Sequence, residues 1–360
     1  MAKITLSNLA HSYLPNPQSK EDYALQPLNH EWEDGAAYAL LGPSGCGKST
    51  LLNIISGILT PSEGAILFND DDVTHKSTVE RNIAQVFQFP VVYDTMTVRQ
   101  NLAFPLRNRG ADPTYIKKRV AAVAKSIQVE DILDKKAQGL TADSKQKISL
   151  GRGMVREDVN AILLDEPLTV IDPHMKWELR TQLKALHKEF KHTMIFVTHD
   201  QTEALTFADK VVVMDKGVVV QIGTPEELFE KPAHTFVGYF IGSPGMNVFK
   251  VNVTGNQVNL EGSLLELPTT YQTLSGNVEL GIRPEFITLC EKGEGIPIQI
   301  IRIEDVAHHQ IVRAMLHQTN LSIIVPEDTK ITPTMTDMRL DMARVNIYVD
   351  GWLVEGERLS

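Results

Sequence analysis

The stretch Gly42-Pro43-Ser44-Gly45-Cys46-Gly47-Lys48-Ser49-Thr50 matches G-x-x-x-x-G-K-[ST], the pattern of loops that wrap nucleotide phosphates. It follows the apolar run Tyr38–Leu41, which is typical of a buried strand. It precedes the run Leu51–Ile55, which is typical of the first turns of a helix. A strand, a Gly-rich loop and a helix in this order are the context that the motif requires. The sequence therefore predicts that residues 42–50 bind a nucleotide.

Charge explains how this loop would hold phosphate. Its glycines let backbone N–H groups surround phosphate oxygens, and the start of the next helix adds a partial positive charge. Lys48 can reach the outer phosphates, and the Ser49 hydroxyl can coordinate Mg²⁺. Cys46 fills a variable position of the loop, where we expect a small inert side chain, with a reactive thiolate as the alternative.

Length and composition narrow the class of protein. The chain has 360 residues, enough for two domains, and its 42% apolar and 22% charged content is that of a folded protein. A net charge of −10 argues against a nucleic-acid binder, which needs a basic face. Two cysteines give no disulfide framework or zinc cluster and fit a reducing cytosol.

No targeting or membrane-spanning segment is predicted. Residues 1–6 lack the apolar core of a signal peptide, and no apolar run approaches the ~20 residues that span a bilayer. If the protein works at a membrane, we expect another subunit to hold it there.

Two patterns divide the chain near residue 240. Residues 3–240 alternate strand-like and helix-like signals, the α/β pattern, and the stripes at 111–127 and 175–190 predict helices with one core face. Past Ser243-Pro244-Gly245, short runs alternate apolar and polar residues between Gly, Pro and Asp. We expect an all-β domain over 241–360, a small barrel.

An acid pair follows a second apolar strand. The run Ala161–Leu164 ends in Asp165 and Glu166. A carboxylate at that strand end can hold Mg²⁺ beside the phosphates, and Glu166 is placed to orient or deprotonate the attacking water. The alternative is that the two acids cap a helix or are solvated.

A third apolar strand precedes Thr198-His199-Asp200. His199 can donate a hydrogen bond to a γ-phosphate, although a lone histidine is usually structural. Asp200 with Glu203 fits a helix capping box, which is the interpretation we prefer for Asp200. Gln88 also follows a strand-like run, but taken alone it carries no information.

Together these residues resemble the ATPase subunit of an ATP-binding-cassette (ABC) transporter. The resemblance rests on their order: phosphate loop 42–50, Gln88, Asp165 and Glu166, a D-loop-like segment 168–172, and His199. It implies an α/β P-loop NTPase over residues 1–240, with a helical subdomain near 90–155. The β tail, with Gly281-Ile282-Arg283-Pro284-Glu285, is similar to the OB-like, TOBE-like accessory domain of importer ATPases for sugars and polyols.

The resemblance assigns roles residue by residue. It implies ATP and Mg²⁺ as cofactors. It implies Ser49, Gln88 and Asp165 as metal ligands, with Glu166, His199 and Gln88 in catalysis and Asp172 in the D-loop. Tyr13 matches the aromatic position that stacks on adenine. The insertion at residues 15–24 makes Tyr23 a competitor for that role, and Tyr13 could also be a plain core or surface residue.

The chain departs from the family at the signature loop. The family has Leu-Ser-Gly-Gly-Gln where this chain has Leu140-Thr141-Ala142-Asp143-Ser144. In the family, this loop contacts the γ-phosphate of ATP bound to the opposite subunit. Thr141 keeps a hydroxyl, Ala142 adds a methyl group, and Asp143 places a negative charge where a polyphosphate should dock. We also expect Asp143 to be the N-cap of the next helix, with Gln146 three residues on.

This departure predicts unlike partners. A homodimer would have two damaged sites, whereas a heterodimer would pair the intact set of this chain with the intact signature of a second, different ATPase subunit. The resemblance also implies two transmembrane permease subunits, whose cytoplasmic helices dock near Gln88–Met96, with Tyr93 and Met96 as plausible contacts. It implies a periplasmic or extracellular solute-binding protein, and a peripheral location on the cytoplasmic face of the bacterial inner membrane.

The segments Gln88–Thr97 and Leu168–Trp177 and the altered signature make the chain similar to one of the two ATPase subunits of bacterial glycerol ABC importers. Glycerol is therefore the expected solute, with another sugar or glycerol phosphate as alternatives. Two rival functions stay open at this point. One is a regulatory cassette that binds ATP but hardly hydrolyses it; the other is a non-transport cassette acting on DNA or ribosomes, which the acidic charge disfavours.

Overall fold

The computed structural model describes residues 2–358, which form two compact units. Residues up to Pro225 belong to the first unit, and residues from Glu226 on belong to the second. None of the described helices combines the length and the apolar character needed to span a bilayer.

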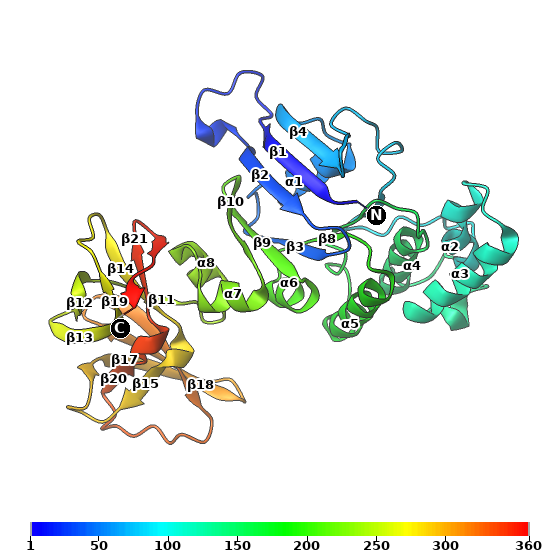
Figure 1. Ribbon diagram of the computed structural model, residues 1–360. Helices are drawn as coiled ribbons and strands as arrows, with labels where there is room; N and C mark the ends of the chain where they lie inside the picture. Colours follow the sequence, from blue (N-terminus) through cyan, green and yellow to red (C-terminus); the bar gives the residue numbers. More distant parts are fainter. Residues whose placement is uncertain (1, 359–360) are drawn as a thin grey trace. The chain divides into compact units, whose positions relative to one another are not determined.

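A six-stranded sheet forms the centre of the first unit (Figure 1). Five of its strands are parallel, and β10 pairs antiparallel with β9 at one edge. Every residue of β3 and β8 is buried, as expected for parallel strands covered on both faces. In spatial order the strands are β10 (Val218–Gly223), β9 (Lys210–Asp215), β3 (Ala37–Leu41), β8 (Met194–Thr198), β7 (Ile162–Asp165) and β6 (Ala84–Val86).

An antiparallel sheet packs on α1 (Lys48–Ser56) through one apolar core. Its strands, in spatial order, are β2 (Leu25–Trp32), β1 (Ile4–His11), β4 (Glu63–Phe68) and β5 (Asp71–Asp72). The short 3₁₀ helix η1 (Lys20–Asp22) lies in the insertion between β1 and β2. Trp32 is fully buried and stacks on Tyr38 of β3, with ring centroids 5.6 Å apart, so that this sheet and the central sheet share a core.

Two helices follow the strands that carry the candidate site. Helix α5 (Pro173–Phe190) buries Leu179, Leu183 and Leu186, which confirms the helical stripe predicted there. Helix α6 (Gln201–Phe207) begins directly after β8 and buries Phe207 against Phe196.

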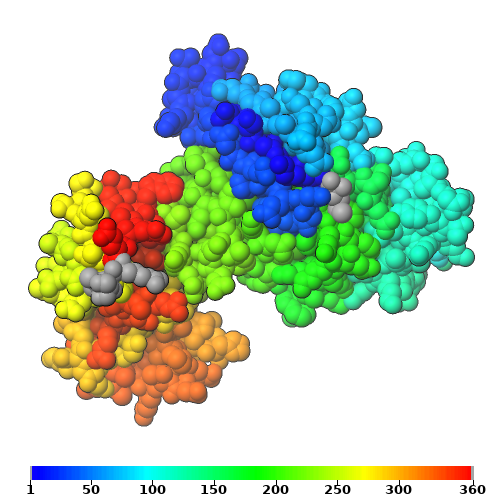
Figure 2. Space-filling view, viewed as in Figure 1, coloured from blue at the N-terminus to red at the C-terminus, as the bar shows by residue number. Residues whose placement is uncertain are grey.

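Three helices form the predicted helical subdomain: α2 (Val98–Arg107), α3 (Pro113–Ser126) and α4 (Ala142–Met154). The 3₁₀ helix η2 (Glu130–Ile132) lies between α3 and α4. Thr97 and Asp112 cap α2 and α3 by accepting hydrogen bonds from the free backbone N–H groups of the first turn. Helix α4 packs closely on α2 at Gly151, where an added Cβ would lie only 2.6 Å from the Leu102 side chain. In Figure 2 the α2 and α3 region, coloured cyan, forms an outer lobe of this unit.

The second unit begins with two short helices, α7 (Pro225–Glu230) and α8 (Thr235–Phe240), and continues as antiparallel strands. Its apolar core includes Phe249, Leu280, Val312, Ile323 and Ile347, each of which is essentially buried. The elements after α8 are β11 (Asn247–Lys250), β12 (Asn252–Leu260), β13 (Ser263–Tyr271), β14 (Val278–Ile282), η3 (Pro284–Phe286), β15 (Ile287–Cys290), β16 (Ile296–Pro297), β17 (Gln299–Asp305), β18 (His309–Leu316), β19 (Thr319–Pro326), β20 (Asp337–Leu340), η4 (Met342–Arg344), β21 (Asn346–Val349), β22 (Trp352–Val354) and β23 (Glu357–Arg358).

One buried arginine ties the two short helices to the β strands. Arg283 donates hydrogen bonds to the carbonyls of Phe229 at 3.0 Å, Gly238 at 2.8 Å, Leu228 at 3.2 Å and Ile241. Burial lowers the pKa of Arg283 to about 10, so the guanidinium keeps its charge at neutral pH. These bonds join the two short helices to the second unit, which begins at Glu226, whereas the sequence prediction places the boundary near residue 240.

Replacing Arg283 with leucine should destabilise the second unit by about 3 kcal/mol or more, because each buried carbonyl left without a donor costs about 1–3 kcal/mol. Urea unfolding of the full chain, followed by tryptophan fluorescence, measures this. Arg302→Leu is the matched control, because the Arg302 side chain is 67% exposed and forms a surface ion pair with Glu304. Equal stability of the two variants would contradict the role of Arg283.

Candidate active site

The carboxyl ends of β3, β8 and β7 lie in register at one edge of the central sheet. Leu41 pairs with Thr198, and Asp165 pairs with Val197. The phosphate loop follows β3, His199 follows β8, and Glu166 follows β7, so one sheet edge gathers all three predicted groups. This is the edge at which ligands bind in open α/β sheets.

The loop between β3 and α1 has the backbone that phosphate binding requires. Gly47 has φ 101° and a Cβ there would lie 2.5 Å from the Ala24 carbonyl oxygen, so only glycine fits. Lys48 is buried, and its ammonium donates to the carbonyls of Gly42 at 2.8 Å and Pro43 at 2.9 Å. These contacts hold the cation over the loop, where the outer phosphates of a nucleotide would meet it.

Cys46 is a small buried side chain in this loop. Its Sγ lies 3.7 Å from the Lys48 ammonium, which favours the thiolate. Burial acts in the opposite direction and is the larger effect, so the pKa of the Cys46 thiol is raised. The balance favours the inert interpretation over the reactive one.

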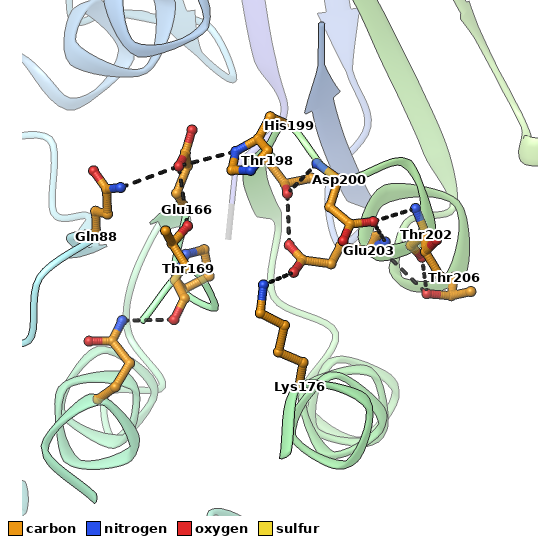
Figure 3. Close-up of polar contacts among 12 residues, drawn as sticks. Gln88, Glu166, Thr169, Lys176, Thr198, His199, Asp200, Thr202, Glu203 and Thr206 are labelled. Atoms are coloured by element: carbon orange, nitrogen blue, oxygen red, sulfur yellow. Dashed lines mark hydrogen bonds and ion pairs between the residues drawn. The ribbon is translucent and has the colours of Figure 1, made fainter. Parts of the chain in front are cut away.

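Glu166 is the centre of a cluster of polar side chains (Figure 3). Its Oε2 lies 3.4 Å from Nε2 of Gln88, 3.3 Å from Nδ1 of His199 and 3.2 Å from Oγ1 of Thr169. The carboxylate is about one quarter exposed, so solvent reaches it. The structure thus brings together the three residues that the resemblance assigns to catalysis.

The backbone at Glu166 is strained. Its φ of 44° lies in the left-handed region, which costs a non-glycine residue of order 1 kcal/mol. The Glu166 N–H donates to the Val197 carbonyl at 2.9 Å, and the Glu166 carbonyl accepts from the Thr169 N–H at 3.2 Å. The chain therefore turns sharply after β7, and the turn directs the carboxylate toward Gln88 and His199.

Asp165 is half-buried at the end of β7. Burial and the adjacent Glu166 raise the pKa of the Asp165 carboxyl, and Lys48 opposes this shift. Mg²⁺ prefers oxygen ligands, which are available here from the Ser49 hydroxyl, the Asp165 carboxylate and the Gln88 amide. Nucleotide phosphates would complete the coordination of the ion. These residues fit a magnesium nucleotide.

His199 and Asp200 have different roles. The His199 side chain is 60% exposed at the edge of the site. Asp200 is the N-cap of α6 and accepts from the N–H groups of Thr202 at 2.7 Å and Glu203 at 3.2 Å, as predicted. The reciprocal half of the capping box is wrong: Glu203 is buried, where a carboxylate needs polar partners, and it binds Lys176 at 3.3 Å and Thr198 at 2.7 Å instead.

Of the two candidate adenine partners, Tyr13 lies beside the phosphate loop. Its hydroxyl is 3.2 Å from Oγ1 of Thr50, and the ring, supported edge-on by His11, is 65% exposed. Tyr23 instead donates its hydroxyl proton to Glu63 at 2.6 Å. The geometry therefore favours Tyr13 as the aromatic face available to a base.

The N-cap of α4 is Thr141 and not Asp143, which corrects the sequence prediction. Thr141 has extended backbone angles, and its Oγ1 accepts from the Ser144 N–H at 3.3 Å. Asp143 already lies inside the first turn, so its side chain is not the N-cap. Its negative charge still interacts favourably with the positive end of the helix dipole. Its carboxylate lies 3.8 Å from the Lys147 ammonium. The signature loop also includes Ala142. The negative charge of Asp143 is thus fixed at the start of α4.

Sequence reasoning missed the role of one residue, Gln146. Its side chain is fully buried, and its Nε2 donates to the carbonyls of Pro167 at 2.8 Å and Phe87 at 3.4 Å. Phe87 precedes Gln88, and Pro167 follows Glu166. One amide on the signature helix therefore holds the backbones on both sides of the Gln88–Glu166 contact. Glutamine is common on protein surfaces, so the residue type alone predicts no role. The available signal was the position of Gln146, five residues after Thr141 on the helix that follows the signature loop.

Replacing Gln146 with methionine keeps the volume but removes both hydrogen bonds. We expect kcat for ATP hydrolysis to fall by about tenfold with little change in KM for ATP, because misplacing a catalytic group slows the chemical step. Gln182→Met on α5 is the matched control, because it makes the same exchange at a residue whose amide oxygen is likewise buried. A change in KM alone, or equal losses in both variants, would show that Gln146 does not position Glu166.

Comparisons with known proteins agree with this geometry. Residues 25–169 match the family model described as ABC transporter, and residues 242–287 match the MalK OB fold domain. The chain is 40% identical to the sn-glycerol-3-phosphate import ATP-binding protein UgpC of Brucella abortus, over all of both chains. It is 39% identical to the UgpC of Escherichia coli, over 82% of this chain and 86% of that one.

A solved structure is also similar. CbiO1 from Clostridium perfringens, part of the ABC transporter complex cbiONQ, aligns with a TM-score of 0.57 and 30% identity, over 63% of this chain and 90% of that one. These matches confirm the predicted fold class, a P-loop NTPase followed by an OB-like domain, and the predicted use of ATP with Mg²⁺. The chain belongs to the import ATPases of the ATP-binding-cassette transporter family.

Proposed function

We propose that this chain binds ATP and Mg²⁺ through residues 42–50, Gln88 and Asp165 and hydrolyses ATP with Glu166 as the general base. The observation that carries the proposal is the position of the Glu166 carboxylate between Gln88 and His199, at the sheet edge that also holds the phosphate loop. A base must lie within hydrogen-bond reach of the water it activates, and this site places one beside the phosphates. His199 is then the donor to the γ-phosphate.

The adenine stacks on Tyr13 in this proposal, because that ring is exposed beside Thr50. Nucleotide that bridges two ATPase subunits favours the closed pair over the open pair, so ATP acts as a ligand with different affinities for two conformations. Asp172, the N-cap of α5, holds the D-loop at that interface. Hydrolysis returns the pair to the open state.

The chain works on the cytoplasmic face of the bacterial inner membrane, with two permease subunits and a solute-binding protein outside. An exposed apolar surface supports a permease contact, because such surfaces mark interaction sites. Its side chains are Phe87, Phe89, Val91 and Tyr93. Met96 is only partly exposed, and the Arg152 guanidinium packs 4.6 Å from the Tyr93 ring centroid. Movement of the ATPase pair would reach the permeases through this surface, next to Gln88.

The glycerol unit is the chemistry we propose for the solute. The resemblance to glycerol importer ATPases favours glycerol, and the names of the relatives favour sn-glycerol 3-phosphate. No residue of the ATP site touches the solute, so solute choice belongs to the permeases and the binding protein. Competition between labelled glycerol and unlabelled sn-glycerol 3-phosphate in cellular uptake separates the two solutes.

We predict that Glu166→Gln slows ATP hydrolysis by about 10²-fold or more, the scale for losing a general base, while ATP binding persists. Phosphate release from the assembled transporter measures hydrolysis, and a fluorescent ATP analogue measures binding. Glu189→Gln, at the exposed end of α5, is the control with the same change of charge. Near-normal turnover in Glu166→Gln would refute Glu166 as the general base. No turnover in the unmodified transporter would instead favour a cassette that only binds ATP.

The ATPase pair is a heterodimer in this proposal. Asp143 and Ala142 stand where backbone glycines should approach the γ-phosphate held by the other subunit, and like charges resist that approach. The rest of the site is intact in this chain: the phosphate loop, Asp165, Glu166 and His199. It therefore needs the signature loop of a different chain. Such a pair would have one competent site.

We expect the purified chain alone to hydrolyse ATP at least about tenfold more slowly than a mixture with its partner ATPase, because one lost backbone donor costs about 10²–10³ in rate. Colorimetric phosphate assays at equal total protein give the ratio. Gel filtration with ATP reports whether the mixed pair forms. Full activity of the chain alone would refute the heterodimer.

A further inference from the structure

The α2–α3 hairpin is strongly basic in an acidic chain. Residues 98–126 contain seven lysines and arginines and a single acid, Asp112, which gives a net charge of +6, whereas the whole chain has −10. Three of these cations have acidic partners elsewhere: Arg99 pairs with Asp134, Arg109 with Asp158 and Arg119 with Glu157. A positive field remains on this surface, and neither catalysis nor the permease contact uses it.

A groove of about 390 Å³ lies between the two helices, within the size range of ligand sites. On α2, Arg99, Ala103 and Arg107 follow one another at intervals of four residues and therefore share one face. The remaining lining residues, from the connecting loop and α3, are Ala111, Pro113, Ile116, Lys117 and Val120. The small Ala103 and the buried Val120 make the floor apolar and leave the space between the helices.

The rim of the groove carries three cations and no acid. Arg107 and Lys117 are exposed, and within residues 2–358 neither has an ion pair. Arg99 donates to Asp134, which is 80% exposed, so that pair can rearrange at little cost. The groove thus combines an apolar floor with converging positive charge.

We propose that this groove binds an amphiphilic anion: a phosphate or carboxylate head held by Arg99, Arg107 and Lys117, with an aliphatic tail on Ala103, Ile116 and Val120. A plain inorganic anion would leave the floor uncovered, and a neutral apolar molecule would leave the cations without a partner. The same chemistry occurs in acidic membrane lipids and in the carboxylates of free fatty acids.

Titration calorimetry of the full chain with dodecyl phosphate, kept below its micelle concentration, tests the site. We expect Lys117→Glu to weaken binding by about tenfold or more, because it reverses a charge at the rim, on the scale known for basic residues near anionic lipid. Lys118→Glu is the matched control: it makes the same change at the next residue, which does not line the groove. Inorganic phosphate should bind far more weakly than dodecyl phosphate.

Flotation with vesicles distinguishes the two sources of the ligand. Vesicles of equal parts phosphatidylglycerol and phosphatidylcholine should retain the chain but not Lys117→Glu if a membrane lipid is the ligand. Binding of dodecyl phosphate without retention by the vesicles indicates that the ligand is a free amphiphilic anion, such as a fatty-acid carboxylate. Three results would overturn the proposal: no binding of either probe, equal losses in Lys117→Glu and Lys118→Glu, or equal affinity for inorganic phosphate.

Discussion

The register of three parallel strands is the constraint on which the site depends. Because β3, β8 and β7 end at one level, the phosphate loop, His199 and the acid pair meet without any long reach by a side chain. The strands themselves are buried on both faces, so the apolar core fixes their register and with it the distances between the polar groups. The site carries backbone strain at the turn after β7, where Glu166 adopts φ 44°.

The site is coupled to the helical subdomain through one side chain. Helix α4 begins at the signature loop, and Gln146 on that helix binds carbonyls next to Gln88 and Glu166. A shift of the signature loop would therefore reach Glu166, the proposed general base, through buried hydrogen bonds. Asp143 lies one turn earlier on the same helix. The segment that departs from the family signature is thus also connected to the Glu166 carboxylate.

Sequence reasoning worked where local chemistry decides the structure. The phosphate loop, the strand ends with their acids and histidine, and the helical stripe of α5 follow from motif and periodicity, and the structure has each of them. It failed where tertiary contacts decide. The buried Glu203 takes Lys176 and Thr198 in place of its helix start, and Thr141 caps α4 because the helix begins one residue after it. No local pattern reveals the hydrogen bonds from Arg283 to carbonyls far away in sequence, which join α7 and α8 to the β strands of the second unit.

We propose that this chain combines an intact catalytic set with a signature loop that cannot serve a second copy of the chain. The direct measurement is the ATPase rate of the purified chain alone, before and after Ala142→Gly and Asp143→Gly restore both glycines. We predict a gain of at least about tenfold, since the backbone can then approach the opposing γ-phosphate without the opposing charge. An unchanged rate in the double variant, with ATP still bound, would contradict the claim.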